Sequence, residues 1–138
     1  MAGTCTVTDS RDNVGVHAAN KEELSVISWA WTSADDGTVS GQGAQGGITG
    51  RIEQVRFIPG SGADAPSDPH SVYLYDEYGV DVLMATGVGQ GANPAVSTTI
   101  QTPFNSNNSY VYLLNATLTP GVTGAGNAKS GTIVLVVR

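Results

Sequence analysis

The chain has 138 residues, a length that fits one domain with its own hydrophobic core; 40% of its residues are hydrophobic and only 13% are charged. Six Lys and Arg residues stand against twelve Asp and Glu, which gives a formal net charge of −6, and the basic residues are scattered along the chain. Because binding to nucleic acid and adsorption to anionic membranes both depend on clustered basic side chains, this charge argues against either partner.

The compartment is indicated by features that the sequence lacks. Its single cysteine, Cys5, cannot form an internal disulfide, so nothing points to an oxidising compartment. The first residues lack the basic start and apolar stretch of a secretory signal. The longest apolar run, Ile133–Val137, is far shorter than the ~18 residues of a membrane span. We therefore predict a soluble protein that is made and folded in a cytoplasm.

Alternating apolar and polar residues predict β-strands from the start of the chain. The first is Thr4–Thr8, although the stretch 1–23 as a whole is less regular. The second, Leu24–Thr32, is apolar on both faces, which indicates a central strand or one covered by a partner. Its tryptophans, Trp29 and Trp31, are predicted to fill the core, and a sugar-stacking platform is the alternative.

The longest β-like run is Ile48–Ile58, in which the alternation slips between Ile52 and Val55. One inserted residue, near Glu53 or Gln54, would restore the register. This pattern predicts a β-bulge.

A loop rich in Pro, Gly and Asp follows at Pro59–His70, and then two shorter β-like runs, Ser71–Asp76 and Gly79–Ala85. The turn Asp76–Gly79 between these runs ends in a glycine, which hairpins often require. Three more strands are expected further along the chain: Val96–Thr102, Tyr110–Leu114 running on toward Leu118, and Thr132–Val137.

Many short strands joined by Gly and Pro turns, without a helical apolar stripe, predict an all-β fold. We expect residues 1–138 to form a single domain, a jelly-roll-like β-sandwich of about eight or nine strands.

Catalytic motifs do not withstand inspection. The segment Gly41–Gly46 matches G-x-G-x-x-G, but it leads into a strand instead of a helix, so it is predicted to be a loop. The two histidines, His17 and His70, lack the motif context of a hydrolytic triad, and Cys5 lies on the predicted buried face of its strand. We predict that the protein is not an enzyme and has no catalytic residue or cofactor; a hydrolase using either histidine is the alternative.

Carboxylates gather at three places: Asp9 with Asp12, Asp35 with Asp36, and Asp76 and Glu77 with Asp81. None reproduces the twelve-residue calcium loop. Because aspartate also caps turns, we predict no metal site, with a weak calcium site built from loops as the alternative.

The remaining candidates are tyrosines in two Y-x-Y pairs: Tyr73 with Tyr75, and Tyr110 with Tyr112. Tyrosine is enriched at protein interfaces, so these four are candidate interface residues. Sugar stacking and ordinary surface positions are the alternatives.

A resemblance extends from about Leu24 to the end of the chain. Its central part, residues 48–87, reads ITGRIEQVRFIPGSGADAPSDPHSVYLYDEYGVDVLMATG. WTS and GTVSG precede it, a glycine-rich stretch at Gly87–Asn93 follows it, and the chain closes on SGTIVLVVR, Ser130–Arg138. In order and spacing these segments resemble the capsid cement, or decoration, proteins of tailed bacteriophages.

The resemblance implies a jelly roll that self-associates, as a homodimer, on the outside of a shell built from a major capsid protein with the HK97-like fold. The expected function is therefore that of a structural virion protein, synthesised in the host bacterial cytoplasm, which bridges capsid subunits and stabilises the shell. A phage tail or baseplate accessory domain, or a carbohydrate-binding β-sandwich module, is the alternative.

Overall fold

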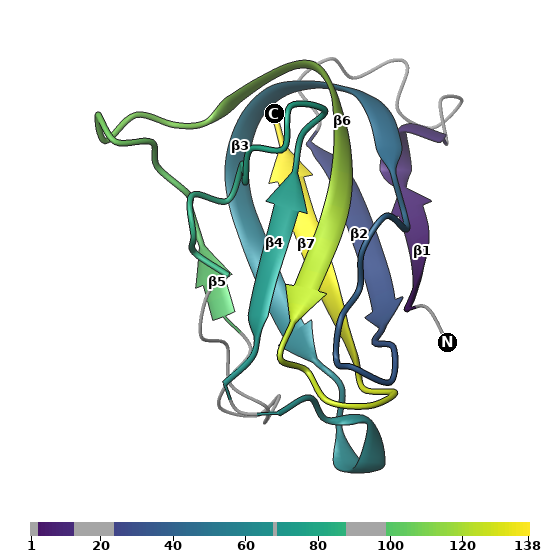
Figure 1. Cartoon of the computed structure of the whole chain (residues 1–138). Coiled ribbons are helices and arrows are strands. Elements are labelled where there is room, and N and C mark those ends of the chain that lie inside the picture. Colours follow the sequence, from purple (N-terminus) through teal and green to yellow (C-terminus); the bar gives the residue numbers. More distant parts are fainter. Residues whose placement is uncertain (1–2, 13–23, 68, 88–98) are drawn as a thin grey trace.

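The computed structural model describes residues 3–12, 24–67, 69–87 and 99–138, which fold into β-strands without an α-helix (Figure 1). The strands are β1 (Thr4–Asp9), β2 (Ser25–Thr32), β3 (Gln45–Pro59), β4 (Ser71–Tyr75), β5 (Thr99–Gln101), β6 (Tyr112–Thr123) and β7 (Ser130–Val137). Two single-turn 3₁₀ helices are η1 (Ser10–Asp12) and η2 (Gly62–Asp64). The prediction of an all-β fold is confirmed.

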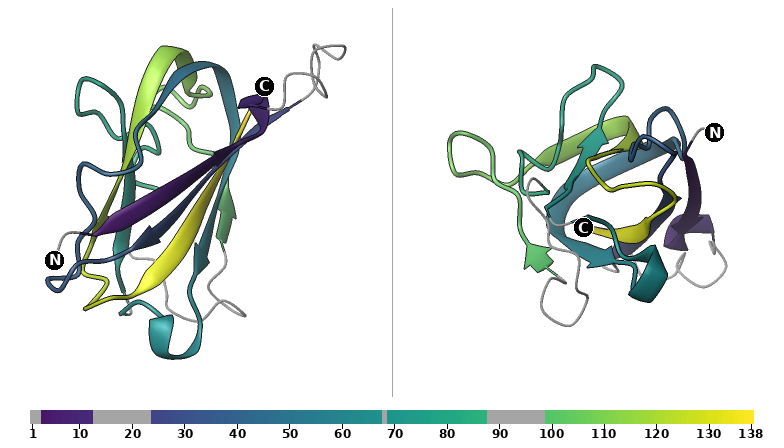
Figure 2. Two further views of the ribbon diagram at one scale, coloured as in Figure 1. Left: turned by 90° about the vertical axis from the view of Figure 1, so that its right-hand side faces the viewer. Right: turned by 60° about the horizontal axis from the view of Figure 1, so that its bottom comes forward.

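All strands pair antiparallel in one curled sheet of order β1-β2-β7-β3-β6-β4, and β5 pairs with β3. β3 belongs to both halves of this sheet, because Gln45–Arg51 pairs with β6 whereas Ile52–Pro59 pairs with β7. As a result, β4 and β6 form one layer over the core, and β1, β2 and β7 form the other (Figure 2).

Irregular pairing lets β3 bend between the two layers. Against β7 the register shifts between Ile52 and Gln54, so the predicted bulge is confirmed. Against β6 the register shifts twice more, on either side of Ile48. Near this corner Gly50 has a φ of +138°, a backbone conformation that only glycine adopts without strain.

The core lies between the two layers and takes side chains from β2, β3, β4, β6 and β7. Both tryptophans of β2 point into it, with Trp29 fully buried and Trp31 2% exposed, so they are core residues and the sugar-platform alternative for them is wrong. The largest fully buried aliphatic side chains beside them are Ile27, Ile48, Ile52, Leu74, Leu83, Leu118, Ile133 and Leu135.

The expected strand at Gly79–Ala85 is wrong. The turn Asp76–Gly79 forms as predicted, with Gly79 at φ +80°, but only a single bridge between Tyr75 and Asp81 follows before the chain enters further turns. The Asp81 carboxylate explains this, because it accepts hydrogen bonds from the backbone N–H groups of Leu74, Leu83 and Ala85 at 3.0–3.1 Å. Aspartate thereby stabilises a turn in place of a strand ladder.

These turns cover the outer edge of β4. The N–H of Val72 donates to the carbonyl of Gly87 at 2.8 Å, and the N–H of Val82 donates to the carbonyl of Leu74 at 2.9 Å. β1, at the other end of the sheet, pairs only with β2 among the described residues. Within the described residues, β1 therefore has an outer edge that no other strand pairs with.

Two predicted segments are described only in part. Of the less regular stretch 1–23, the structure describes residues 3–12, which contain β1. Of the predicted strand Val96–Thr102, residues 96–98 lie outside the described part of the chain, and Thr99–Gln101 form β5.

Candidate binding surfaces

The four candidate tyrosines fall into two separate surfaces. Tyr75 pairs with Thr119 of β6, whereas Tyr112 lies at the beginning of that strand, seven residues earlier. At ~3.3 Å per residue, this separates the two pairs by roughly 20 Å. The two pairs therefore lie on different surfaces of the domain.

The first surface is the outer face of β4. Val72 and Leu74 point into the core, so Tyr73 and Tyr75 point outward, and their rings are nearly parallel with centroids 5.6 Å apart. Gly121 of β6 makes room for them, since a Cβ on this glycine would lie 2.7 Å from the ring of Tyr75. Burial, with the neighbouring Tyr73 and Asp81, raises the pKa of Tyr75 above its ordinary value, so its hydroxyl stays a hydrogen-bond donor at neutral pH.

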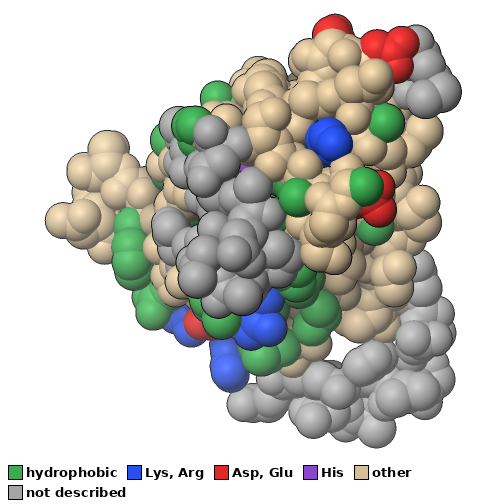
Figure 3. All heavy atoms as spheres, turned by 90° about the horizontal axis from the view of Figure 1, so that it is seen from below, with side chains coloured by type: hydrophobic (Ala, Val, Ile, Leu, Met, Phe, Trp, Pro, Cys, Tyr) green, Lys and Arg blue, Asp and Glu red, His purple; other side chains and the backbone are tan. Residues whose placement is uncertain are grey.

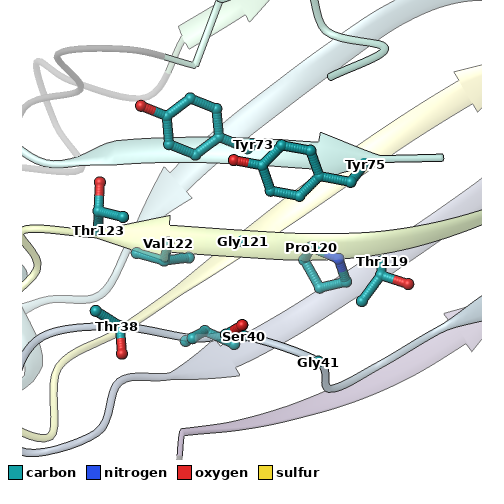
Figure 4. A pocket seen from close by; sticks show the side chains of 11 residues that line it. Thr38, Ser40, Gly41, Tyr73, Tyr75, Thr119, Pro120, Gly121, Val122 and Thr123 are labelled. Carbon is teal, nitrogen blue, oxygen red and sulfur yellow. The ribbon is translucent and has the colours of Figure 1, made fainter. Parts of the chain in front are cut away.

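Beside these rings runs a groove of about 310 Å³ (Figure 4). β6 residues 119–123 form its floor, the two tyrosines stand on one side, and residues 38–41 stand on the other. Residues 38–41 are held against β6 by two backbone hydrogen bonds, since the N–H groups of Val39 and Val122 each donate to the other residue's carbonyl at 3.0 Å. We call this feature the tyrosine groove.

The second surface lies at the opposite end of β6 and on the hairpin at residues 102–111, which projects at the upper left of Figure 1. Phe104 and Tyr110 pair across this hairpin with ring centroids 5.5 Å apart. Tyr112 and Leu114 follow on β6 and are 69% and 84% exposed. We call these four residues the hairpin surface.

A charged cluster borders the hairpin surface. The guanidinium of Arg51 lies 4.4 Å from the centroid of the Tyr110 ring, within cation–π range. Arg51 also donates two hydrogen bonds to Glu53, which raise the pKa of the arginine further, and Arg138 approaches the same carboxylate at 3.4 Å. Arginine and tyrosine in contact, beside exposed apolar side chains, are the composition typical of binding hot spots.

The outer face of the other layer is nearly uncharged. Strand alternation places Thr, Ser, Val and Ala of β1, β2 and β7 on this face, and Arg56 of β3 is the charged residue among them in the described part of the chain. Figure 3 shows the lower end of the molecule, where hydrophobic side chains lie in several places and Lys and Arg side chains lie among them. The nearly uncharged outer face of β1, β2 and β7 adjoins the outer edge of β1.

Cys5 packs against the core, and His70 contacts a core tryptophan. Burial raises the pKa of the Cys5 thiol to about 11, which keeps it protonated and unreactive near neutral pH. His70 is buried with its ring 5.9 Å from Trp31, and its Nδ1 lies 3.1 Å from the carbonyl of Ser67. His17 lies outside the described residues.

The carboxylate groupings serve as local hydrogen-bond acceptors, as the turn interpretation predicts. Asp36 accepts from the N–H and hydroxyl of Thr38, and Asp76 accepts from the N–H groups of Tyr78 and Val80. Within the described ranges, no three His, Cys, Asp or Glu side chains converge as a metal site would require. The glycine-rich segment Gly41–Gly46 is a loop that leads into β3.

Asp9 ties the end of β1 to the beginning of β3. It receives hydrogen bonds from Arg11 at 2.6–3.0 Å and from the side chain of Gln45 at 2.8 Å, while Arg11 also donates to the carbonyls of Gly46 and Gly47. Burial raises the pKa of Asp9, but the hydrogen bonds and charge of Arg11 outweigh it, so the net pKa lies below the ordinary value.

A lowered carboxylate pKa makes a pH-dependent contribution to stability. This contribution is present above the ordinary pKa of aspartate and is lost as the pH falls through the lowered, folded-state value. We expect Asp9→Asn to reduce the free energy of unfolding at pH 7 by about 1–3 kcal/mol, and the deficit should shrink as the pH falls below about 4. Urea unfolding at several pH values measures this, with the exposed Asp64→Asn as control; a deficit independent of pH would contradict it.

No family model, no curated protein and no solved structure matches the chain. No helix in the described ranges is long and apolar enough to cross a membrane.

Sequence reasoning did not find Phe104, Leu114 or the loop 38–41. Strand alternation buries Leu113 and exposes Leu114, which was named only as the end of an expected strand. The period-2 pattern, applied strictly, would have separated the two leucines.

Proposed function

We propose that this chain is a structural virion protein that binds the outer surface of a phage capsid and bridges subunits of a major capsid protein with the HK97-like fold. The proposal includes the self-association as a homodimer and the jelly-roll arrangement that the sequence resemblance implies, with the eight or nine strands that the alternation pattern predicts. Its location would be the capsid exterior, where a net charge of −6 meets no packaged nucleic acid.

The observation that carries the proposal is the hairpin surface. Phe104, Tyr112 and Leu114 are 46%, 69% and 84% exposed, and they lie at one end of the domain beside the Arg51–Tyr110 contact. Large apolar side chains that are this exposed and this close together mark an interaction site. Repetition over the many equivalent positions of a shell would turn modest contacts into strong attachment.

A different surface supports self-association. Within the described residues, β1 has no strand on its outer edge, and the adjoining face of β1, β2 and β7 is almost free of charge. Strand addition at such an edge supplies main-chain hydrogen bonds to a second copy. A dimer formed there would leave both hairpin surfaces free for neighbouring capsid subunits.

The test adds the purified protein to expanded shells assembled from the major capsid protein alone and measures binding by co-sedimentation. We expect saturable, stoichiometric binding and a higher temperature of shell disruption. The double variant Tyr112→Ala/Leu114→Ala should weaken binding at least about tenfold, because side chains in the centre of an interface each contribute about 1–2 kcal/mol or more.

Tyr78→Ala is the matched control, since Tyr78 is also 84% exposed but lies in the turn after β4. Absence of wild-type binding to shells, together with unchanged heat resistance of particles lacking the protein, would refute the proposal. Immunogold labelling of intact virions separates it from the alternative of a tail or baseplate accessory domain. Analytical ultracentrifugation checks the homodimer.

A further inference from the structure

The tyrosine groove has an aromatic side that is fixed in place. Tyr73 and Tyr75 are two residues apart on one strand, and their rings are inclined by only 14° to each other. The ring of Tyr75 packs against Gly121, whose missing side chain leaves room for it. In Figure 4 the two rings lie side by side above β6, and their hydroxyl groups point in the same direction.

The rest of the groove is polar without being charged. None of its eleven lining residues carries a charge, and six of them carry a hydroxyl group: Thr38, Ser40, Tyr73, Tyr75, Thr119 and Thr123. Thr38 donates its hydroxyl to Asp36. The side-chain hydroxyls of the other five form no hydrogen bond with any described residue, so they remain available to a ligand.

We propose that the tyrosine groove binds a neutral saccharide, with one or two sugar rings stacked on Tyr73 and Tyr75. The C–H groups on the apolar face of a pyranose are weakly positive and complement the negative face of an aromatic ring. The sugar hydroxyls are both donors and acceptors, which matches the hydroxyl groups of Ser40 and Thr119.

Charge and size decide between the possible ligands. An acidic sugar or a phosphate would require a basic partner, and the lining residues contain none. A volume of about 310 Å³ lies at the lower end of the range for small-molecule sites, and this fits a short saccharide segment entering an open groove. Because the two tyrosine rings are already fixed in place, binding of a ligand costs little side-chain entropy.

Saccharide binding by the tyrosine groove does not depend on attachment of the protein to a shell. The groove lies on β4 and the end of β6, roughly 20 Å along β6 from the hairpin surface. A protein attached to a capsid through the hairpin surface would keep the groove accessible, and binding of saccharide can be measured on the free protein.

The experiment titrates ¹⁵N-labelled protein with three neutral hexasaccharides, cellohexaose, maltohexaose and hexa-N-acetylchitohexaose, and with the acidic hexagalacturonate. We expect saturable chemical-shift changes with at least one neutral probe, confined to amides of residues 38–41, 73–75 and 119–123. Hexagalacturonate should produce no saturable change. Tyr75→Ala should weaken binding of the active probe at least about tenfold.

Two further variants distinguish a loss of saccharide contacts from a loss of binding that is caused by misfolding. Tyr73→Phe/Tyr75→Phe retains both rings and should bind severalfold more weakly through loss of the hydroxyls, while Tyr78→Ala should bind as the wild type does. The proposal is overturned if no neutral probe gives a saturable change or if Tyr75→Ala binds the active probe undiminished. Decaproline serves as a probe for a peptide ligand, and the proposal is also overturned if decaproline occupies the groove and the sugars do not.

Discussion

Replacement of Trp29 by alanine is expected to lower the free energy of unfolding by about 3–5 kcal/mol. The side chain is fully buried at the centre of β2, between the neighbours β1 and β7. Its removal leaves a cavity that the surrounding strands cannot close, because each is fixed by its own ladder of hydrogen bonds. Thermal and urea unfolding followed by circular dichroism measures the loss.

A second variant separates the cavity from the hydrogen bond that the indole makes. The Trp29 Nε1 donates to the carbonyl of Gly43 at 2.8 Å. Trp29→Phe keeps most of the volume but leaves this carbonyl without its donor, so we expect a smaller loss of about 1–3 kcal/mol. Tyr78→Ala, at an exposed position, serves as the control. A loss below about 1 kcal/mol in Trp29→Ala would show that the core is not organised around this residue.

The second large effect is expected at the corner of β3. At Gly50 the φ of +138° disfavours any other residue, and an added Cβ would lie 2.5 Å from the backbone oxygen of Arg138 and 2.8 Å from Val137. The chain cannot move aside easily, because Arg51 and Arg138 exchange backbone hydrogen bonds at 2.9 and 3.1 Å. Gly50→Ala should therefore cost about 2–5 kcal/mol, from backbone strain and steric overlap together.

Gly46→Ala is the matched control within the same strand. Gly46 has no positive φ, and a Cβ there would meet only the hydroxyl of Thr117, at 3.2 Å. It should change stability by less than about 1 kcal/mol. Equal effects of the two substitutions on the urea midpoint would contradict the special role of Gly50.

The strands were predictable where one face is buried and the other is not. The tryptophans of β2 were predicted to fill the core, the outward-pointing tyrosines of β4 were candidate interface residues, and the slip near Glu53 revealed the bulge of β3. Gly79–Ala85 failed because alternating Val and Asp read as a strand, whereas the Asp81 carboxylate is an acceptor for three nearby N–H groups.

The extent of β6 and the division of the tyrosines were beyond the sequence. Pro120 argues against a strand, yet it is accommodated because its strand partner is Leu74 of β4 alone, and the bridge on the other side of β6 is made by Val122, two residues later. In the sequence Tyr73 and Tyr110 are both members of Y-x-Y pairs, so the two pairs cannot be distinguished by pattern. Only the pairing of β6 with both β3 and β4 places one pair on a groove and the other at the opposite end.

The position of β7 has a consequence for the order of folding events. β7 lies between β2 and β3, so the middle of the sheet cannot form until β7 has been synthesised, roughly 70 residues after the end of β3. Closing such long loops slows folding and leaves strand edges exposed in the meantime. A chain emerging from the ribosome would hold β2 and β3 without their shared neighbour, which makes this interval the period of greatest risk for aggregation during assembly of the protein.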